Sequence, residues 1–130
     1  MTPFGARMRA LRRSRGITLK AMAAALGVSS AYLSALEHGR RGRPTWYLVQ
    51  QIIVYFNVIW DESEEIIRLA DLSHPRVVID TAGLDPRATE IANLLAERIA
   101  EATDAELDAL VAILRGQAPG KPVDKLVKSG

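Results

Sequence analysis

Apolar residues recur with a helical period through the first part of the chain. Phe4, Met8 and Leu11 are spaced by four and three residues, which places them on one face of a helix. The arginines between them would then point outward, and Gly16 supplies a stop signal. The pattern therefore predicts an amphipathic helix over residues 4–14.

Capping residues and glycines predict two more helices close behind. Thr18 is an N-cap residue for a helix that Gly27 ends, and Ser29 is one for a helix from Ser30 to about His38. The buried positions expected in the first of these helices are Leu19, Met22, Ala23 and Leu26.

A fourth and a fifth helix complete the predicted bundle. Thr45 caps an apolar helix that stops near Asn57, and Asp61 with Glu64 forms a capping box for a short helix to about Asp71. Five helices of this kind predict a single all-α bundle. The buried positions expected in the fourth helix are Leu48, Ile52 and Phe56.

The helical period breaks after this bundle and then returns. The segment between Pro75 and Gly83 is extended in character and predicts either a linker or a short strand at 76–80. Asp85 followed by Pro86 is a strong helix start. The helix that begins there is expected to bury Ile91, Leu94, Leu95 and Ile99.

Thr103 with Glu106 forms a second capping box, for a helix that runs to Gly116. A lone helical hairpin cannot cover two apolar stripes, so we expect this pair of helices to form a homodimer interface. The alternative is that the pair completes the core of residues 1–71. The apolar positions of the last helix are Leu107, Leu110, Val111 and Leu114.

These breaks divide the chain into four parts. The predicted domains are a bundle over residues 1–72, a linker or short strand over 73–84 and a helical oligomerisation region over 85–116. Residues 117–130 contain two prolines and two glycines and are expected to form a disordered tail.

Basic and acidic residues are unevenly distributed along the chain. Residues 1–47 carry nine basic residues and a single acid, Glu37, whereas residues 48–130 carry eight basic residues and fourteen acids. The net charge of +2 conceals this asymmetry. A basic excess concentrated in one third of the chain predicts a surface that binds nucleic acid.

Several function classes lack any signature in the sequence. The chain has no cysteine, no signal peptide and no apolar run of the roughly 20 residues that span a bilayer, so we expect a cytoplasmic protein with no membrane partner. No nucleophile–base pair or glycine-rich phosphate loop is present, so no enzymatic activity, cofactor or small-molecule ligand is expected. His38 and His74 are too far apart in sequence for a local metal pair.

The third predicted helix is apolar on one side and small on the other. At 100° per residue Leu33 and Leu36 face the core, whereas Ala31, Ser34 and Ala35 point the opposite way. A helix whose outward side chains are small can lie deep in a DNA major groove, which is about 12 Å wide.

The segment ITLKAMAAALGVSSAYLSALEHGRRGRP resembles the helix-turn-helix core of the Xre family, which includes the lambda-type phage repressors and Cro. The resemblance covers roughly residues 4–70 and implies an all-α, five-helix bundle of the lambda-repressor type, here followed by a C-terminal helical pair. The residues that carry it are Ala23, Leu26-Gly27-Val28-Ser29, Tyr32-Leu33-Ser34 and Leu36-Glu37-His38-Gly39.

The resemblance also implies roles for individual residues. Thr18 would lie against a phosphate, the small residues of the third helix would face base edges, and Tyr32 would flank them. Arg12 would pair with Glu37 and hold the reading helix in place. The implied DNA-binding residues are Thr18, Ser29, Ser30, Ala31, Tyr32, Ser34, Ala35, Arg40, Arg41 and Arg43.

The chain departs from the family pattern at three positions. Many members have glutamine at the start of the second helix and polar residues on the reading face, where this chain has Leu19, Ala31 and Ala35. Direct hydrogen bonding to bases would therefore be poor. Specificity would rest on thymine methyl contacts, the serines and DNA shape.

These features predict a transcriptional regulator that binds double-stranded DNA sequence-specifically. The favoured form is a homodimeric repressor on an inverted-repeat operator, and repressors of prophage-like or gene-transfer clusters are similar in layout. The alternative is an antitoxin that regulates its own synthesis and neutralises a partner through its C-terminal half. Neutralising segments are usually disordered until bound, so the well-capped helices of residues 86–115 favour self-association.

Overall fold

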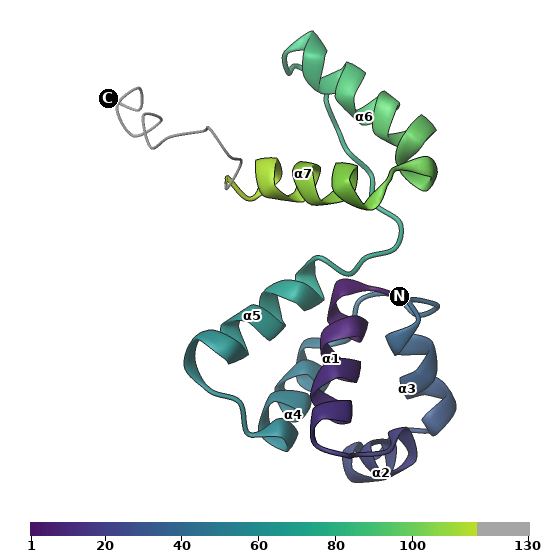
Figure 1. Ribbon diagram of the computed structural model, residues 1–130, viewed down its shortest axis with the longest axis vertical. Helices are drawn as coiled ribbons and strands as arrows, with labels where there is room; N and C mark the ends of the chain where they lie inside the picture. Colours follow the sequence, from purple (N-terminus) through teal and green to yellow (C-terminus); the bar gives the residue numbers. More distant parts are fainter. Residues whose placement is uncertain (117–130) are drawn as a thin grey trace. The chain divides into compact units, whose positions relative to one another are not determined.

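The computed structural model describes residues 1–116, and every regular element in them is helical (Figure 1). The all-α prediction is therefore confirmed. The tail predicted for residues 117–130 lies outside the described residues. The α-helices are α1 (Pro3–Ser14), α2 (Leu19–Leu26), α3 (Ser30–Glu37), α4 (Trp46–Phe56), α5 (Trp60–Asp71), α6 (Pro86–Arg98) and α7 (Asp104–Leu114), with a 3-10 turn η1 (Ile99–Glu101) before α7.

The chain divides into two compact units, Met1–Val78 and Ile79–Gly130. We call the first the bundle, and the described part of the second, residues 79–116, the C-terminal unit. Residues 76–80, at the boundary, contain no strand, so that alternative for the segment is wrong. A single extended segment forms a strand only when another strand supplies its backbone hydrogen bonds, and the described elements are all helices.

The predicted N-caps of the bundle are confirmed at three helix starts. The side-chain oxygens of Thr18, Ser29 and Thr45 accept hydrogen bonds from backbone N–H groups in the first turns of α2, α3 and α4. Two of these helices end in left-handed residues, Gly27 with φ 72° and Asn57 with φ 54°. Local sequence signals thus set most of the helix bounds.

The start of α5 differs from the prediction. The helix begins at Trp60, and its N-cap, Ile59, makes no side-chain hydrogen bond, so the capping box at Asp61 and Glu64 is wrong. Asp61 and Glu62 lie inside the first turn instead, where carboxylates are stabilised by the positive end of the helix dipole.

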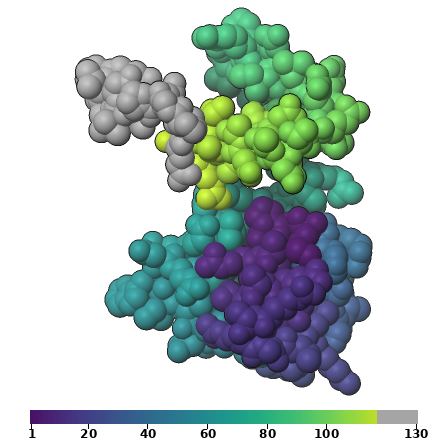
Figure 2. All heavy atoms as spheres, viewed as in Figure 1, coloured from purple at the N-terminus to yellow at the C-terminus, as the bar shows by residue number. Residues whose placement is uncertain are grey.

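The core lies where α1 packs against α3 and α5, and α4 packs against α2 and α5. Side chains fill the spaces between these helices (Figure 2). Leu11 and Leu19, which share the predicted apolar faces, are only partly buried. The buried apolar residues are Phe4, Met8, Met22, Ala23, Leu26, Leu33, Leu36, Leu48, Val49, Ile52, Phe56, Val58, Ile66, Leu69 and Ala70.

Ser73 closes the bundle just after α5. Its side chain is 2% exposed, and its Oγ accepts a hydrogen bond from the backbone N–H of Phe4 at 2.9 Å. The same hydroxyl donates to the carbonyl of Leu69 at 2.5 Å. Ser73, which the sequence places in the linker, therefore belongs to the bundle.

The C-terminal unit consists of α6, η1 and α7. Asp85 caps α6, with its Oδ1 2.8 Å from the N–H of Arg87, and both hydrogen bonds of the capping box between Thr103 and Glu106 are present. No residue of α6 or α7 is buried. The prediction that α6 buries Ile91, Leu94, Leu95 and Ile99 is wrong for a single chain, because α6 and α7 diverge and do not cover one another (Figure 1).

Within the described residues, no single helix has both the length and the apolar composition of a membrane span. By those two criteria alone α2 and α3 would pass together, but the chain bends by 111° between them.

Candidate nucleic-acid interface

A short turn joins α2 and α3 and sets the angle between them. Gly27 adopts its left-handed conformation, Val28 N donates to the carbonyl of Ala23 at 3.0 Å, and Ser29 caps the next helix. The resulting bend of 111° lies within the roughly 90–120° range of helix-turn-helix motifs. The turn therefore positions α3 as the second helix of such a pair.

The helix α3 is buried along one stripe and open along the other. Leu33, Leu36 and Glu37 are each at most 2% exposed and face the core. On the other side Ala31 is exposed, and the neighbouring Ser34 and Ala35 are half-buried. Because these outward side chains are small, another macromolecule can approach the helix backbone closely.

An ion pair fixes the C-terminal end of α3 to α1. Arg12 Nε donates to Glu37 Oε2 at 3.1 Å and Arg12 Nη2 donates to Glu37 Oε1 at 3.3 Å, so the pair is bidentate. The third guanidinium nitrogen, Nη1, donates to the carbonyl of Ile17 at 3.2 Å. Each of the three guanidinium nitrogens of Arg12 thus donates a hydrogen bond within the bundle.

A glycine allows α1 and α3 to touch backbone to backbone. A Cβ at Gly5 would lie 2.3 Å from the carbonyl oxygen of Glu37, closer than any side chain could tolerate. Gly5 was not identified from the sequence as a functional residue. An isolated glycine inside a helical pattern is the signal that could have indicated this close approach.

Residues 3–72 match the family model of a helix-turn-helix domain. The chain belongs to this helix-turn-helix family. Two curated relatives come from Bacillus subtilis (strain 168). The HTH-type transcriptional regulator RghRB is 36% identical over 61 residues, which are 47% of this chain and 44% of the relative. The HTH-type transcriptional repressor RghR is 46% identical over 44 residues, which are 34% of this chain and 33% of the relative.

The matched regions thus span less than half of either relative. No solved structure matches the chain. The resemblance to helix-turn-helix regulators that the sequence indicates is confirmed by the family match, which covers α1 to α5.

The three arginines after α3 of this helix-turn-helix domain have different surroundings. Arg40 and Arg41 are exposed and form no ion pair within residues 1–116, and Arg41 stacks over the ring of Tyr32 at 5.2 Å. Arg43 instead donates to Asp71 Oδ1 from Nε at 3.0 Å and from Nη2 at 2.5 Å. Arg43 therefore ties the basic loop to the end of α5.

Arg7 of α1 and Arg15, the C-cap of that helix, contact other parts of the bundle. Arg15 donates to the carbonyl of Phe56, and its guanidinium carbon lies 5.5 Å from the centre of the Phe56 ring. Arg7 and Glu62 form an ion pair at 3.5 Å. Part of the basic excess of residues 1–47 is therefore used within the fold.

Thr18 and Ser29, both predicted to contact DNA, are exposed and serve as caps. Each side-chain oxygen accepts a backbone N–H at 3.0 Å, which leaves the hydroxyl proton as a donor.

His38 and His74, distant in sequence, line one groove beside the start of α1. Among the described residues, no group of three or more histidine, aspartate or glutamate side chains could hold a metal ion.

Proposed function

We propose that this protein is a sequence-specific regulator that binds double-stranded DNA through α3 and represses transcription from an inverted-repeat operator. The observation that carries the proposal is the outward face of α3, whose side chains are small and which is held at 111° to α2. Beside it lie Arg40 and Arg41, which form no ion pair with any residue of the range 1–116. Membership of the helix-turn-helix family supports the same function.

In this proposal α3 lies in the major groove. Ala31, Ser34 and Ala35 would face base edges, because they lie on the side opposite the buried stripe, and Ser30 would reach the DNA from the exposed N-terminal end of α3. Few of these side chains can form hydrogen bonds, so specificity would come from thymine methyl contacts, the two serines and the shape of the DNA. Thr18 and Ser29 would bind the sugar-phosphate backbone from the helix starts.

The arginines after α3 would bind phosphates. Arg40 and Arg41 can do so because neither is paired with an acid in the part of the chain that the structure describes, and stacking on Tyr32 would orient Arg41. The ion pair with Asp71 makes Arg43 the weakest candidate of the three, and we propose that it chiefly shapes the loop.

Repression and two-fold binding rest on further arguments. One curated relative is named a transcriptional repressor, although the similarity to it covers only 44 residues. A single module of this size reads one half-site, and two linked modules can read two half-sites about 34–36 Å apart. Because α3 offers few hydrogen-bonding groups, the added avidity of a second module would be needed for useful affinity.

The proposal is tested by selecting fragments from a random DNA pool with the intact protein. We expect an enriched inverted repeat, and we expect Ala31→Glu to abolish binding to it because the new carboxylate would face the groove. Ala10→Glu, the same change at an exposed position of α1, is the matched control and should retain binding. If Ala31→Glu bound the operator normally, α3 could not lie in the major groove, and the proposal would be wrong.

A second measurement separates backbone contacts from base contacts. Arg41→Ala should weaken binding to all sequences alike and reduce the slope of log affinity against log salt by about one unit. Arg68→Ala removes an exposed arginine from α5 and should leave the slope unchanged. A changed sequence preference with an unchanged slope would contradict the phosphate assignment.

A further inference from the structure

The helix α7 is apolar on two sides, and a single neighbouring helix can cover only one of them. At 100° per residue, the acids Asp104 and Asp108 mark one border between the two apolar sides, and Glu106 marks the other. A helix that is apolar nearly all round is normally buried by several neighbours. One apolar side consists of Leu107, Leu110, Val111 and Leu114, and the other of Ala105, Ala109, Ala112 and Ile113.

The large side chains of the C-terminal unit are instead open to solvent. Leu114 is 79% exposed, Ile91 57% and Val111 51%. Apolar side chains contribute stability only when they leave water, at about 25 cal/mol per Å² of buried surface. Well-formed helix caps combined with an uncovered apolar surface indicate that the unit is completed by another molecule.

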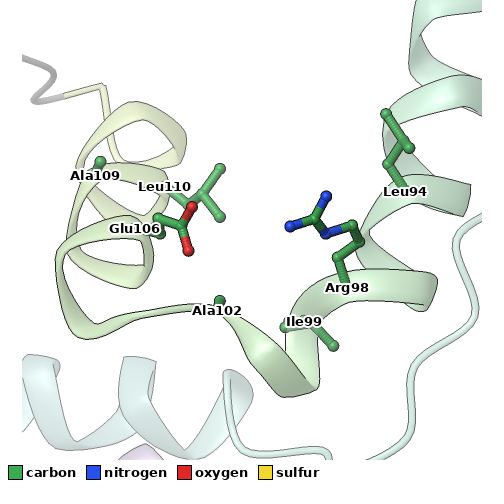
Figure 3. A pocket seen from close by; sticks show the side chains of 7 residues that line it. All are labelled: Leu94, Arg98, Ile99, Ala102, Glu106, Ala109 and Leu110. Atoms are coloured by element: carbon green, nitrogen blue, oxygen red, sulfur yellow. The ribbon is translucent and has the colours of Figure 1, made fainter.

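The divergence of α6 and α7 leaves a groove of about 450 Å³ between them (Figure 3). Apolar side chains line most of it, and two charged side chains stand at its rim. Arg98 points into the groove from the α6 side and Glu106 points toward it from α7 (Figure 3). The apolar lining consists of Leu94, Ile99, Ala102, Ala109 and Leu110.

The two charges at the rim face one another without forming an ion pair. Arg98 takes part in no ion pair within residues 1–116, and the Glu106 carboxylate binds its own helix start at Thr103, whose N–H donates to it at 2.9 Å. The groove thus presents one positive and one negative rim to whatever enters it.

We propose that the groove is occupied by α7 of a second copy of this chain, related by a two-fold axis, with Arg98 of each copy paired to Glu106 of the partner subunit. The inference rests on the proposed function, which requires two linked reading modules. Two copies would bring four helices together, so that each α7 gains neighbours on both of its apolar sides.

Self-complementarity favours a second copy over another occupant. A two-fold interface brings the same surface of each molecule together, so a groove and a ridge on one chain satisfy each other. Here the leucine side of α7 is the ridge, and the opposite charges at the rim become attractive when one copy is turned against the other. DNA is excluded as the occupant because residues 79–116 carry eight acids and three basic residues.

The rim charges allow a test of pairing between chains with the full-length protein and no DNA. In homodimers, Arg98→Glu would place two glutamates at each contact, and Glu106→Arg would place two arginines there. In a mixture, a chain with Arg98→Glu and a chain with Glu106→Arg restore both attractive pairs. We expect each variant alone to raise the dimer dissociation constant at least about tenfold, and the mixture to return within about threefold of the original protein.

Two controls separate this effect from loss of structure. Glu97→Arg reverses an exposed acid of α6 that does not line the groove and should leave the dimer intact. Thr103→Ala weakens the cap of α7 without changing any charge, and so measures the part of the Glu106→Arg effect that comes from the lost capping box. A chain carrying both charge reversals should form homodimers and fail to pair with the original chain.

Sedimentation velocity and mass spectrometry of tagged mixtures read out each outcome. A monomeric original protein, single variants that remain dimeric, or a mixture that stays monomeric would each overturn the proposed pairing. A monomer would point to a different protein as the occupant. Because no DNA is present, a negative result in this dimerisation experiment would not contradict the proposal that α3 binds DNA. Likewise, the result of the Ala31→Glu binding experiment would not affect the conclusion about pairing between chains.

Discussion

The bundle and the C-terminal unit are built from equally clear local signals and differ in what those signals achieve. Thr18 starts α2 and Thr103 starts α7 through the same kind of hydrogen bond. Yet fifteen apolar side chains are buried in the bundle, and none is buried in α6 or α7. Caps and periodicity therefore specify a helix, whereas burial depends on which other elements reach it.

The largest expected change in the stability of the bundle comes from replacing Arg12. Arg12→Ala would leave the carboxylate of Glu37, 2% exposed, without its partner. Removing one member of a buried ion pair costs about 3–5 kcal/mol, so the free energy of unfolding of the bundle should fall by that amount. Urea unfolding followed by amide NMR signals of α1 and α3 measures it, and the helices of the C-terminal unit should not respond.

Arg13→Ala is the matched control, because Arg13 is exposed and adjacent to Arg12. It should change the free energy of unfolding by less than about 0.5 kcal/mol. Equal effects of the two substitutions would mean that the ion pair does not hold α3 to α1.

A smaller loss is expected where α1 and α3 touch. Gly5→Ala would place a Cβ 2.3 Å from the carbonyl oxygen of Glu37, so the two helices must separate. Overpacking of this kind costs about 1–3 kcal/mol and would also displace the reading helix, so DNA affinity should fall with stability. Gly42→Ala adds the same atom in open space and should leave the free energy of unfolding unchanged. If a destabilised Gly5→Ala protein bound DNA as well as the original protein, the contact between Gly5 and Glu37 would not be what positions α3.

The sequence predicts the helices and their faces well because both depend on near neighbours. The caps Thr18, Ser29 and Thr45 lie three residues from the amides that they bind, and Leu33 and Leu36 mark the buried side of α3 by spacing alone. The reading face then follows as the opposite side.

Features that join distant segments could not be derived in the same way. Nothing near Gly5 reveals that Glu37 will lie against it, and Ser73 looks like part of a linker until Phe4 donates a hydrogen bond to it. The contact of Arg43 with Asp71 likewise depends on how α5 returns beside the loop. These three contacts each join segments at least 28 residues apart.

The smallest expected effect lies in the C-terminal unit and depends on pH. The pKa of the Glu106 carboxyl is lowered from its ordinary value, first because the backbone N–H of Thr103 donates to it, then because of the Thr103 hydroxyl, with a smaller contribution from Arg98. Since the folded pKa is lowered, the stabilisation of α7 is fully present above the ordinary glutamate pKa of about 4.3 and is lost as the pH falls through the folded pKa. An NMR titration of the Thr103 amide should therefore show a transition below that value. Glu106→Gln keeps a hydrogen-bond acceptor without the charge and should abolish the transition, and a midpoint above the ordinary pKa would contradict the cap.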